Sequence, residues 1–485
     1  MTRRLVVWIM VAVVAIYGIY VVGANIFLNT DVAFKLINKK PEKMHIQWSS
    51  GTTIWPGVVT IKDFQIRGQS KKMQWFCEMP GGTFHISLLA LASKQIKIRQ
   101  GRGDGFDFRT RRRLTLEEAQ TEIAGLLPEI PGFSNPPDPA PEDLYPPKKK
   151  KKKKPWHLKI NQVDLVGPVN LWLNRMQITG TGKVGGSVDY LLGHEMEIPT
   201  AHLVLADGKF LIDSAAFAEQ LEIEIKAGFE PFVLKETKGL GILEFIRAEV
   251  AIPSAVVPDL NVFGKLFPAD SGTRVESGSA SLQGSLSVAE YGSAQAEFTM
   301  QATGLDVVSF DGRTQGDLEV VTKLRQGNLV TGQFDLAGTS FRLDNFIDSD
   351  LKKTQKDPWW GQIELVSGQI DLAGKTVAAA IKLDFKDSKP LMAMFGAKAI
   401  PRINDLQGSV ELDMDAEMVV IEPMDFSGKD LVMLGRLGIV QGKARGNIYV
   451  KYLGIPIAVN LTADGTKLVM KKPLRWYESQ PPIRN

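Results

Sequence analysis

The stretch "GNIYVKYLGIPIAVNLTADG" (446–465) contains the pattern that decides the fold. Apolar side chains alternate with other residues in both halves, at Ile448, Val450 and Tyr452 and then at Ile455, Ile457, Val459 and Leu461. A period of two residues puts one set of side chains on one face of a strand. Leu453-Gly454 separates the halves, so the sequence predicts two strands paired as a hairpin with one apolar face.

The same alternation continues through residues 156–485. It recurs in "LEIEIKAG" (221–228) and in "AAIKLDFKD" (379–387), where Ile381, Leu383 and Phe385 form the apolar set. Glycines punctuate these runs, and we expect each unit to be a strand, a glycine and another strand. Asp207-Gly208 is typical of a hairpin turn. The sequence therefore predicts a mainly β protein built as a long antiparallel meander, with short helices only at 242–247, 260–267 and 390–395.

The N-terminus carries "LVVWIMVAVVAIYGIYVVGA" (5–24), which contains no charged residue. About 20 residues at ~1.5 Å rise cover the ~30 Å hydrocarbon core of a bilayer, whereas the apolar core of a signal peptide is usually shorter. We expect residues 1–27 to be an uncleaved transmembrane anchor, although Val22-x-Ala24 resembles a cleavage site. Arg3 and Arg4 favour a cytoplasmic N-terminus, with the rest of the chain translocated.

Two further regions precede the long β-rich part. Residues 28–127 suggest a mixed β region, and the capping-box pair Thr115 and Glu118 predicts one short helix over 116–127. Residues 128–155 are rich in proline and end in the lysine run 148–154, which predicts a disordered or extended linker. That run either binds anionic lipid head groups or serves as a solvated spacer.

The charge balance argues against a nucleic-acid-binding protein. The net charge is +4, but the run 148–154 supplies seven lysines, so the rest of the chain sums to 4 − 7 = −3. A nucleic-acid-binding protein spreads basic residues over a folded face. Nucleic acid is therefore not an expected partner.

No motif for catalysis stands out in the sequence. Cys77 is the only cysteine, the five histidines lack metal-ligand spacing, and no glycine loop followed by lysine is suited to a phosphate. We therefore expect a protein that is not an enzyme and has no catalytic, metal or cofactor site. The pairs Trp359-Trp360 and Trp476-Tyr477 suit either a membrane interface or a buried strand end.

One segment resembles a known family. "VAIPSAVVPDLNVFGKLFPADSGTRVESGSASLQGSL" (250–286) is similar to the AsmA-like superfamily, which includes the TamB-type proteins of Gram-negative envelopes. The matching positions are Pro258, Asp259, Leu260, Leu266, Pro268, Gly278, Leu282 and Gly284. "DSKPLMAMFGAKAIPRINDLQGSVELDM" (387–414) resembles a second such segment, with Pro401 after a short helix. The resemblance implies a twisted β-groove, lined by apolar side chains, that stands in the periplasm on an inner-membrane anchor and shields lipid.

An alternating sheet must hide its apolar face, so the open choice is between a groove and an elongated, closed sandwich. For a groove, the candidate lining residues are Ile455, Ile457, Val459, Leu461, Ile381, Leu383 and Phe385. We expect a single-pass protein of the bacterial inner membrane that binds phospholipid for transport between membranes or for outer-membrane maintenance. The alternative is an anchored subunit of a secretion or outer-membrane assembly machine, with an envelope protein as its partner.

Overall fold

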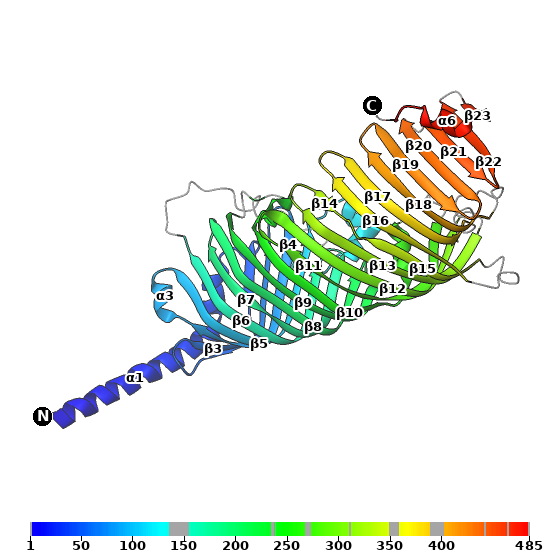
Figure 1. Cartoon of the computed structure of the whole chain (residues 1–485). Helices are drawn as coiled ribbons and strands as arrows, with labels where there is room; N and C mark the ends of the chain where they lie inside the picture. Colours follow the sequence, from blue (N-terminus) through cyan, green and yellow to red (C-terminus); the bar gives the residue numbers. More distant parts are fainter. Residues whose placement is uncertain are drawn as a thin grey trace. The chain divides into compact units, whose positions relative to one another are not determined.

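The protein is mainly β, and its strands form one mixed sheet of 23 strands (Figure 1). The computed structural model describes residues 2–134, 155–233, 237, 239–266, 273–309, 312–348, 358–388, 402–440, 443–462 and 465–483. Within these ranges the chain divides into two compact units, Met1–Val250 and Ala251–Asn485, with the division inside strand β10. Each unit is described by itself.

Unit 1 contains the long N-terminal helix, two short helices and the strands up to β10. The helices are α1 (Thr2–Leu28), α2 (Asp31–Ile37) and α3 (Leu88–Ala92), with 3-10 turns η1 (Glu118–Gln120), η2 (Glu122–Leu126) and η3 (Gly239–Phe245). The strands are β1 (Met44–Gln47), β2 (Ser50–Thr52), β3 (Val58–Gln69), β4 (Met73–Ile86), β5 (Gln95–Arg112), β6 (His157–Leu173), β7 (Met176–Leu191), β8 (Glu195–Ile212), β9 (Ala215–Val233) and β10 (Ile246–Val257).

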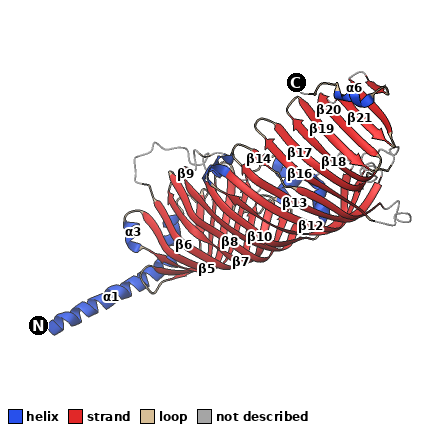
Figure 2. Ribbon diagram, in the orientation of Figure 1, coloured by secondary structure: helices blue, strands red, loops and turns tan. Residues whose placement is uncertain are grey.

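Unit 2 is almost entirely strand (Figure 2). Among its described residues, the helical elements are η4 (Leu260–Leu266), η5 (Glu290–Gly292) and α6 (Pro473–Glu478). Its strands are β11 (Thr273–Val288), β12 (Ser293–Ser309), β13 (Gly312–Asn328), β14 (Gln333–Asp335), β15 (Ser340–Asp348), β16 (Trp359–Asp371), β17 (Thr376–Asp387), β18 (Asn404–Met414), β19 (Met418–Gly428), β20 (Leu431–Val440), β21 (Lys443–Tyr452), β22 (Ile455–Thr462) and β23 (Gly465–Val469).

Most strands pair antiparallel with their neighbours in the sequence, so the predicted meander is confirmed. The predicted hairpin is confirmed as well, because Tyr452 pairs with Ile455 across a turn in which Leu453 and Gly454 both have positive φ. One pair differs from the meander. β5 and β6 run parallel, from Gln95↔His157 onward, and the long connection between them contains the predicted linker. The strands before and after that linker therefore belong to one sheet.

The expected role of glycine as a strand separator is wrong at several positions. The "SGSASLQGSLSV" run lies inside the single strand β11, and Asp207-Gly208 lies inside β8 rather than in a hairpin turn. The pairing of β8 with β9 shifts register between Leu205 and Gly208, and Asp207 has a φ of 51°. A bulge needs the same permissive backbone as a tight turn, so the sequence could not distinguish the two.

Several strand glycines instead lie beside an aromatic ring on the neighbouring strand. Gly361 is paired with Phe385, and Gly408 is paired with Phe426. A Cβ atom at either glycine would collide with the paired phenylalanine ring. Glycine is therefore required because the ring occupies the space of the missing side chain.

The predicted helix over 116–127 is replaced by the turns η1 and η2. The capping box is present, since the Thr115 N–H donates to Glu118 Oε2 (3.0 Å) and the Glu118 N–H donates to Thr115 Oγ1 (3.2 Å). Residues Pro128–Ser134, which begin the predicted linker, belong to the folded unit. Ile130 is buried, and Arg111 donates hydrogen bonds to the carbonyl oxygens of Pro128 and Ser134. The rest of the predicted linker, residues 135–154 with the lysine run, lies outside the described residues.

The predicted short helices at 242–247 and 260–267 correspond in part to the 3-10 turns η3 and η4. The one predicted at 390–395 lies outside the described residues, as do Pro268 and Pro401 of the family resemblance. Leu260 of that resemblance is buried, and it lies over Gly278, where a Cβ atom would be 2.9 Å from Leu260 Cδ1. Leu260 therefore packs against β11 at a position that only glycine allows.

Candidate functional site

An apolar surface crosses unit 2 from β11 to β22. The strand registers place one row of side chains side by side, here called the central row: Leu282, Met300, Val320, Phe341, Ile363, Leu383, Gly408, Phe426, Met433, Val450 and Ile457. Directly paired residues share a face of the sheet. Glycine aside, every position of the central row is therefore an apolar side chain on the same face.

The side chains one residue before or after the central-row positions, which point to the opposite face, are mostly polar. The outer row consists of Ser281, Gln301, Glu319, Arg342, Gln362, Asp384, Gln407, Ser427, Val432, Lys451 and Pro456. Most of these positions are polar or charged, and many are exposed. From β11 to β20 the sheet of unit 2 thus separates an apolar face from a more polar, more exposed face.

The sequence candidates lie on the apolar face. Ile457 and Leu383 belong to the central row. Ile381 and Val459 belong to a second apolar row, which runs Leu365, Ile381, Val410, Met424, Gly435, Ile448, Val459 and Leu468. Leu461 pairs with Gly446 in a row beyond it. These registers bring the two predicted sets, from β17 and from β22, onto one surface.

Two candidates differ from the others in their exposure. Phe385 is 1% exposed, and its ring stacks on Trp359 with centroids 5.6 Å apart. Trp359 Nε1 donates to the Asp387 carbonyl oxygen (2.8 Å), which fixes this cluster at one margin of the sheet. Ile455 is 60% exposed at the hairpin turn. Phe385 is therefore a packed margin of the apolar face, and the half-buried positions between it and the far margin form its accessible part.

The apolar face of unit 2 is half-buried rather than dry. Leu383, Phe426 and Val450 are only partly buried, and Phe341 is 41% exposed. Within the described residues, the helical elements in extended contact with this unit's strands are η4 against β11, η5 against β13 and α6 against β21 and β22. α6 packs on the other face, where Tyr477 lies near Tyr449 and Ala458 is buried. Much of the central row therefore keeps partial access to solvent.

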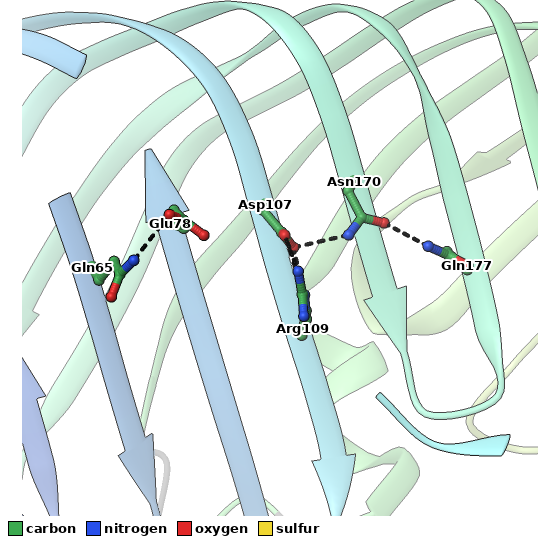
Figure 3. Close-up of polar contacts among 6 residues, drawn as sticks. All are labelled: Gln65, Glu78, Asp107, Arg109, Asn170 and Gln177. Carbon is green, nitrogen blue, oxygen red and sulfur yellow. Dashed lines mark hydrogen bonds and ion pairs between the residues drawn. The ribbon is translucent and has the colours of Figure 1, made fainter. Parts of the chain in front are cut away.

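Unit 1 is two-sided in the same way. Figure 3 shows a polar row on β3 to β7, in which Gln65 Nε2 donates to Glu78 Oε1 and Asn170 Nδ2 donates to Asp107 Oδ1, both at 2.9 Å. Gln177 Nε2 extends the row by donating to Asn170 Oδ1. One residue along, the register aligns an apolar row of Ile66, Cys77, Phe108, Leu171, Ile178 and Phe210. The polar row is half-buried, and its members hydrogen-bond to one another across the strands.

Cys77 stands in the apolar row of unit 1. Burial, with the nearby carboxylates of Asp107 and Glu78, raises the pKa of its thiol from 9.0 to about 12. A thiol with so high a pKa is a poor nucleophile at neutral pH. Cys77 therefore behaves as a small apolar side chain.

The N-terminal helix makes a second feature, here called the asparagine seam. α1 contains a stretch, Val7–Leu28, that is long and apolar enough to cross a membrane. Asn25 Nδ2 donates to the Thr53 carbonyl oxygen (2.7 Å), and its Oδ1 accepts from the Thr53 N–H (2.9 Å). Asn29 makes the same pair of bonds with Gly51, at 2.6 and 3.1 Å. The two amides therefore pair with alternate residues of the sheet edge at β2, as a neighbouring strand would.

The seam was not recognised in the sequence. Two asparagines four residues apart lie on one side of a helix, and this spacing at the end of an apolar run is the signal that could have found them. Tyr20 adds to the seam, because its hydroxyl lies 3.1 Å from Thr53 Oγ1 and accepts from the Gly57 N–H. The seam covers a strand edge that would otherwise be open to pairing with another chain.

Together these features define a class of protein: a two-faced β-sheet joined along one edge to an apolar N-terminal helix. Comparison of the chain with family models, with curated proteins and with solved structures finds no match.

Proposed function

We propose that the chain is a membrane-anchored, non-enzymatic protein whose apolar face in unit 2 shields the acyl chains of phospholipid. In this proposal α1 stays in the inner membrane of a bacterial envelope, the sheet stands in the periplasm, and the lipid is in transit between membranes or serves outer-membrane maintenance. The observation that carries the proposal is the central row: an unbroken apolar path whose neighbouring outer row is mostly polar.

An acyl chain suits this surface for a physical reason. Burial of apolar area in water is favourable by about 25 cal/mol per Å², or ~0.8 kcal/mol for each methylene group. This gain needs no directional partner, and the central row offers no side-chain donor or acceptor. A lipid tail can thus cover the partly exposed positions while its head group stays in water.

The length of the path favours several lipids or a moving one. The central row crosses ten strand-to-strand steps, which at ~4.8 Å each make roughly 48 Å. One leaflet of a bilayer core is only about 15 Å thick, half of ~30 Å. A single acyl chain would therefore cover about a third of the row, as expected of a conduit rather than of a pocket for one ligand.

Site-specific photo-crosslinking tests the proposal directly. A benzophenone amino acid is placed at Ile457 or Leu383 on the apolar face, and at Val432 or Lys382 on the opposite face. The full-length chain is irradiated in cells, purified in detergent and examined by mass spectrometry for covalent lipid. We expect phospholipid adducts at Ile457 and Leu383, and at least tenfold fewer at the two control positions.

A charge on the apolar face provides a second measurement. Ile457→Asp introduces a carboxylate that reaches water when the face is open, so folding should persist while co-purified lipid falls several-fold. Val432→Asp is the matched control, two strands away on the outer row, and it should keep its lipid. Crosslinks from Ile457 to protein instead of lipid would favour the alternative, a subunit of a secretion or assembly machine. Unfolding of Ile457→Asp in a chain that never carries lipid would indicate a dry core.

A further inference from the structure

Exposed apolar side chains gather at the end of unit 1 where α1 joins the sheet. They come from three places in the chain: the β2–β3 turn, α3 with its flanks, and the starts and ends of β6 and β7. The apolar rim, as this set is called here, consists of Ile54, Trp55, Leu88, Leu89, Leu91, Trp156 and Leu192, which are 66%, 68%, 42%, 89%, 40%, 44% and 42% exposed. Large apolar side chains that are exposed together in this way mark a site of interaction.

Backbone hydrogen bonds tie these segments to one another. The Ile86 N–H donates to the Gly57 carbonyl oxygen (2.6 Å), which joins the approach to α3 to the β2–β3 turn. The His157 N–H donates to the Lys94 carbonyl oxygen (3.1 Å), just after α3. Figure 1 shows α3 at the same end of the sheet as the base of α1. The rim is therefore one surface and not a set of unrelated loops.

The turns at the other ends of these strands have a different composition. They carry Lys71 and Lys72 between β3 and β4, Asn174 and Arg175 between β6 and β7, and Asp213 between β8 and β9. Polar turns are the ordinary state of a sheet in water. Exposed apolar side chains also flank these turns, at Met73, Leu173 and Met176 (46%, 38% and 48% exposed), but the turn residues themselves are polar. At the α1 end, in contrast, the β2–β3 turn and α3 themselves carry the apolar side chains.

Contacts with the rim show which part of α1 lies beside it. Tyr17 donates its hydroxyl to the Ile54 carbonyl oxygen (2.9 Å), and the Tyr17 ring lies 6.3 Å from the Trp55 ring. The polar contacts of the helix thus begin at Tyr17 and continue to Asn29. Aromatic residues such as these favour the membrane–water interface. The part of α1 before these contacts, from Leu5 to Ile16, rises only ~18 Å at ~1.5 Å per residue.

A rise of ~18 Å falls short of the ~30 Å hydrocarbon core by roughly 12 Å. The rim lies beside the helix at the level where this shortfall occurs, and amphipathic surfaces commonly sink ~5–10 Å into the boundary between head groups and acyl chains. Entry of the rim into the membrane would make up much of the missing thickness. It would also remove Ile54, Trp55 and Leu89 from water.

We infer that the apolar rim of unit 1 inserts into the leaflet on the C-terminal side of α1, so that unit 1 rests on the bilayer. The occupant of this surface is the lipid of the membrane that α1 crosses. The inference needs α1 to lie in a membrane, but it does not depend on lipid binding by the apolar face of unit 2. It adds a defined orientation: the α1 end of the unit 1 strands faces the bilayer, and the charged turns face away.

Depth-dependent quenching tests the inference on the full chain. Cys77→Ser provides a background without cysteine, into which Trp55→Cys, Leu89→Cys or the control Lys71→Cys is introduced and labelled with the fluorophore NBD. Each protein is reconstituted into vesicles of three parts phosphatidylcholine to one part phosphatidylglycerol, with or without lipid carrying a spin label near the head group. Spin-labelled lipid should lower the fluorescence at positions 55 and 89 at least twofold, and aqueous iodide should have little effect there. Position 71 should show the reverse.

Two results would contradict this reasoning, one about the rim itself and one about the seam that holds it. Strong iodide quenching at positions 55 and 89, with no effect of spin-labelled lipid, would overturn the inference. Leu89→Cys keeps the test valid if Trp55→Cys disturbs its turn, because Leu89 is almost fully exposed. Adding Asn25→Leu and Asn29→Leu should reduce lipid quenching at position 55, since the seam would no longer hold the β2–β3 turn against α1. Undiminished quenching in that variant would show that the seam does not position the rim.

Discussion

Removal of the asparagine seam should release α1 from the sheet without unfolding either. The double variant Asn25→Leu, Asn29→Leu replaces both amides by apolar side chains of similar size that favour a helix more strongly than asparagine does. It deletes four hydrogen bonds to the backbone of Gly51 and Thr53. The N–H and carbonyl groups at that edge then lose the partners that a strand edge needs.

The magnitude follows from those four bonds. At a net ~1 kcal/mol each, their loss amounts to about 4 kcal/mol of local stability. Thr53 is only 3% exposed, so water replaces its lost hydrogen-bond partners poorly. Each bond lost at Thr53 should therefore cost toward the upper end of the usual range, about 1.5 kcal/mol. Because ~1.4 kcal/mol corresponds to a factor of ten, local opening should become roughly a thousandfold more frequent.

Hydrogen exchange measured by mass spectrometry is the assay. The backbone N–H groups of Gly51 and Thr53 donate two of the four seam hydrogen bonds, so a peptide covering residues 48–57 should exchange faster in the double variant. Peptides from β6 and β7 should not change. Ile26→Leu is the matched control, since Ile26 is 59% exposed on the same helix. Equal protection of residues 48–57 in the double variant and in the parent chain would refute the reasoning.

Three further predictions concern single residues. With its pKa raised to about 12, the Cys77 thiol should react with iodoacetamide at pH 8 about a thousandfold more slowly than in the unfolded chain, as measured by alkylation with time. Gly182→Ala should lower the melting temperature and the free energy of unfolding, the latter by about 1–3 kcal/mol, because its Cβ would overlap a backbone oxygen of β8. Gly81→Ala is the control and should leave the melting temperature unchanged, because its Cβ would meet no atom closer than 3.9 Å. Burial and the charge of Arg67 lower the pKa of His45 below 6.5, so the unfolded chain binds this proton more readily than the folded chain does. The melting temperature should therefore fall as the pH drops from 7.5 to 5, and His45→Gln should flatten that dependence.

Much of the architecture could be predicted because period-two alternation is a local signal. The hairpin at Leu453-Gly454 and the shared apolar face of Ile457 and Val459 both follow from residues close together in the chain. Which strands pair with each other cannot be predicted from such local patterns. Nothing near Gln95 indicates that β5 pairs parallel with β6, because that pairing joins segments separated by the long connection between them.

The misread glycines have a related cause. Gly361 and Gly408 look like the punctuation of turns, yet each makes room for a phenylalanine on the next strand. A turn and a cross-strand aromatic contact both need the absence of a Cβ atom, and only the register tells them apart. The four-residue spacing of Asn25 and Asn29 could have marked one side of a helix, but their partners are backbone groups of an edge strand that the sequence does not reveal.

The apolar face of the sheet and the seam at its edge both bear on how the chain associates with other molecules. A one-sided sheet that is left half-exposed in water must either associate with something apolar or be kept away from its own copies. The seam closes the sheet edge at β2, where a second copy could add a strand, whereas the central row is half-buried among the described residues. The chain thus blocks one route to association through its backbone while it keeps an apolar surface available. That combination is expected when the intended occupant has no backbone to pair with, as a lipid acyl chain does not.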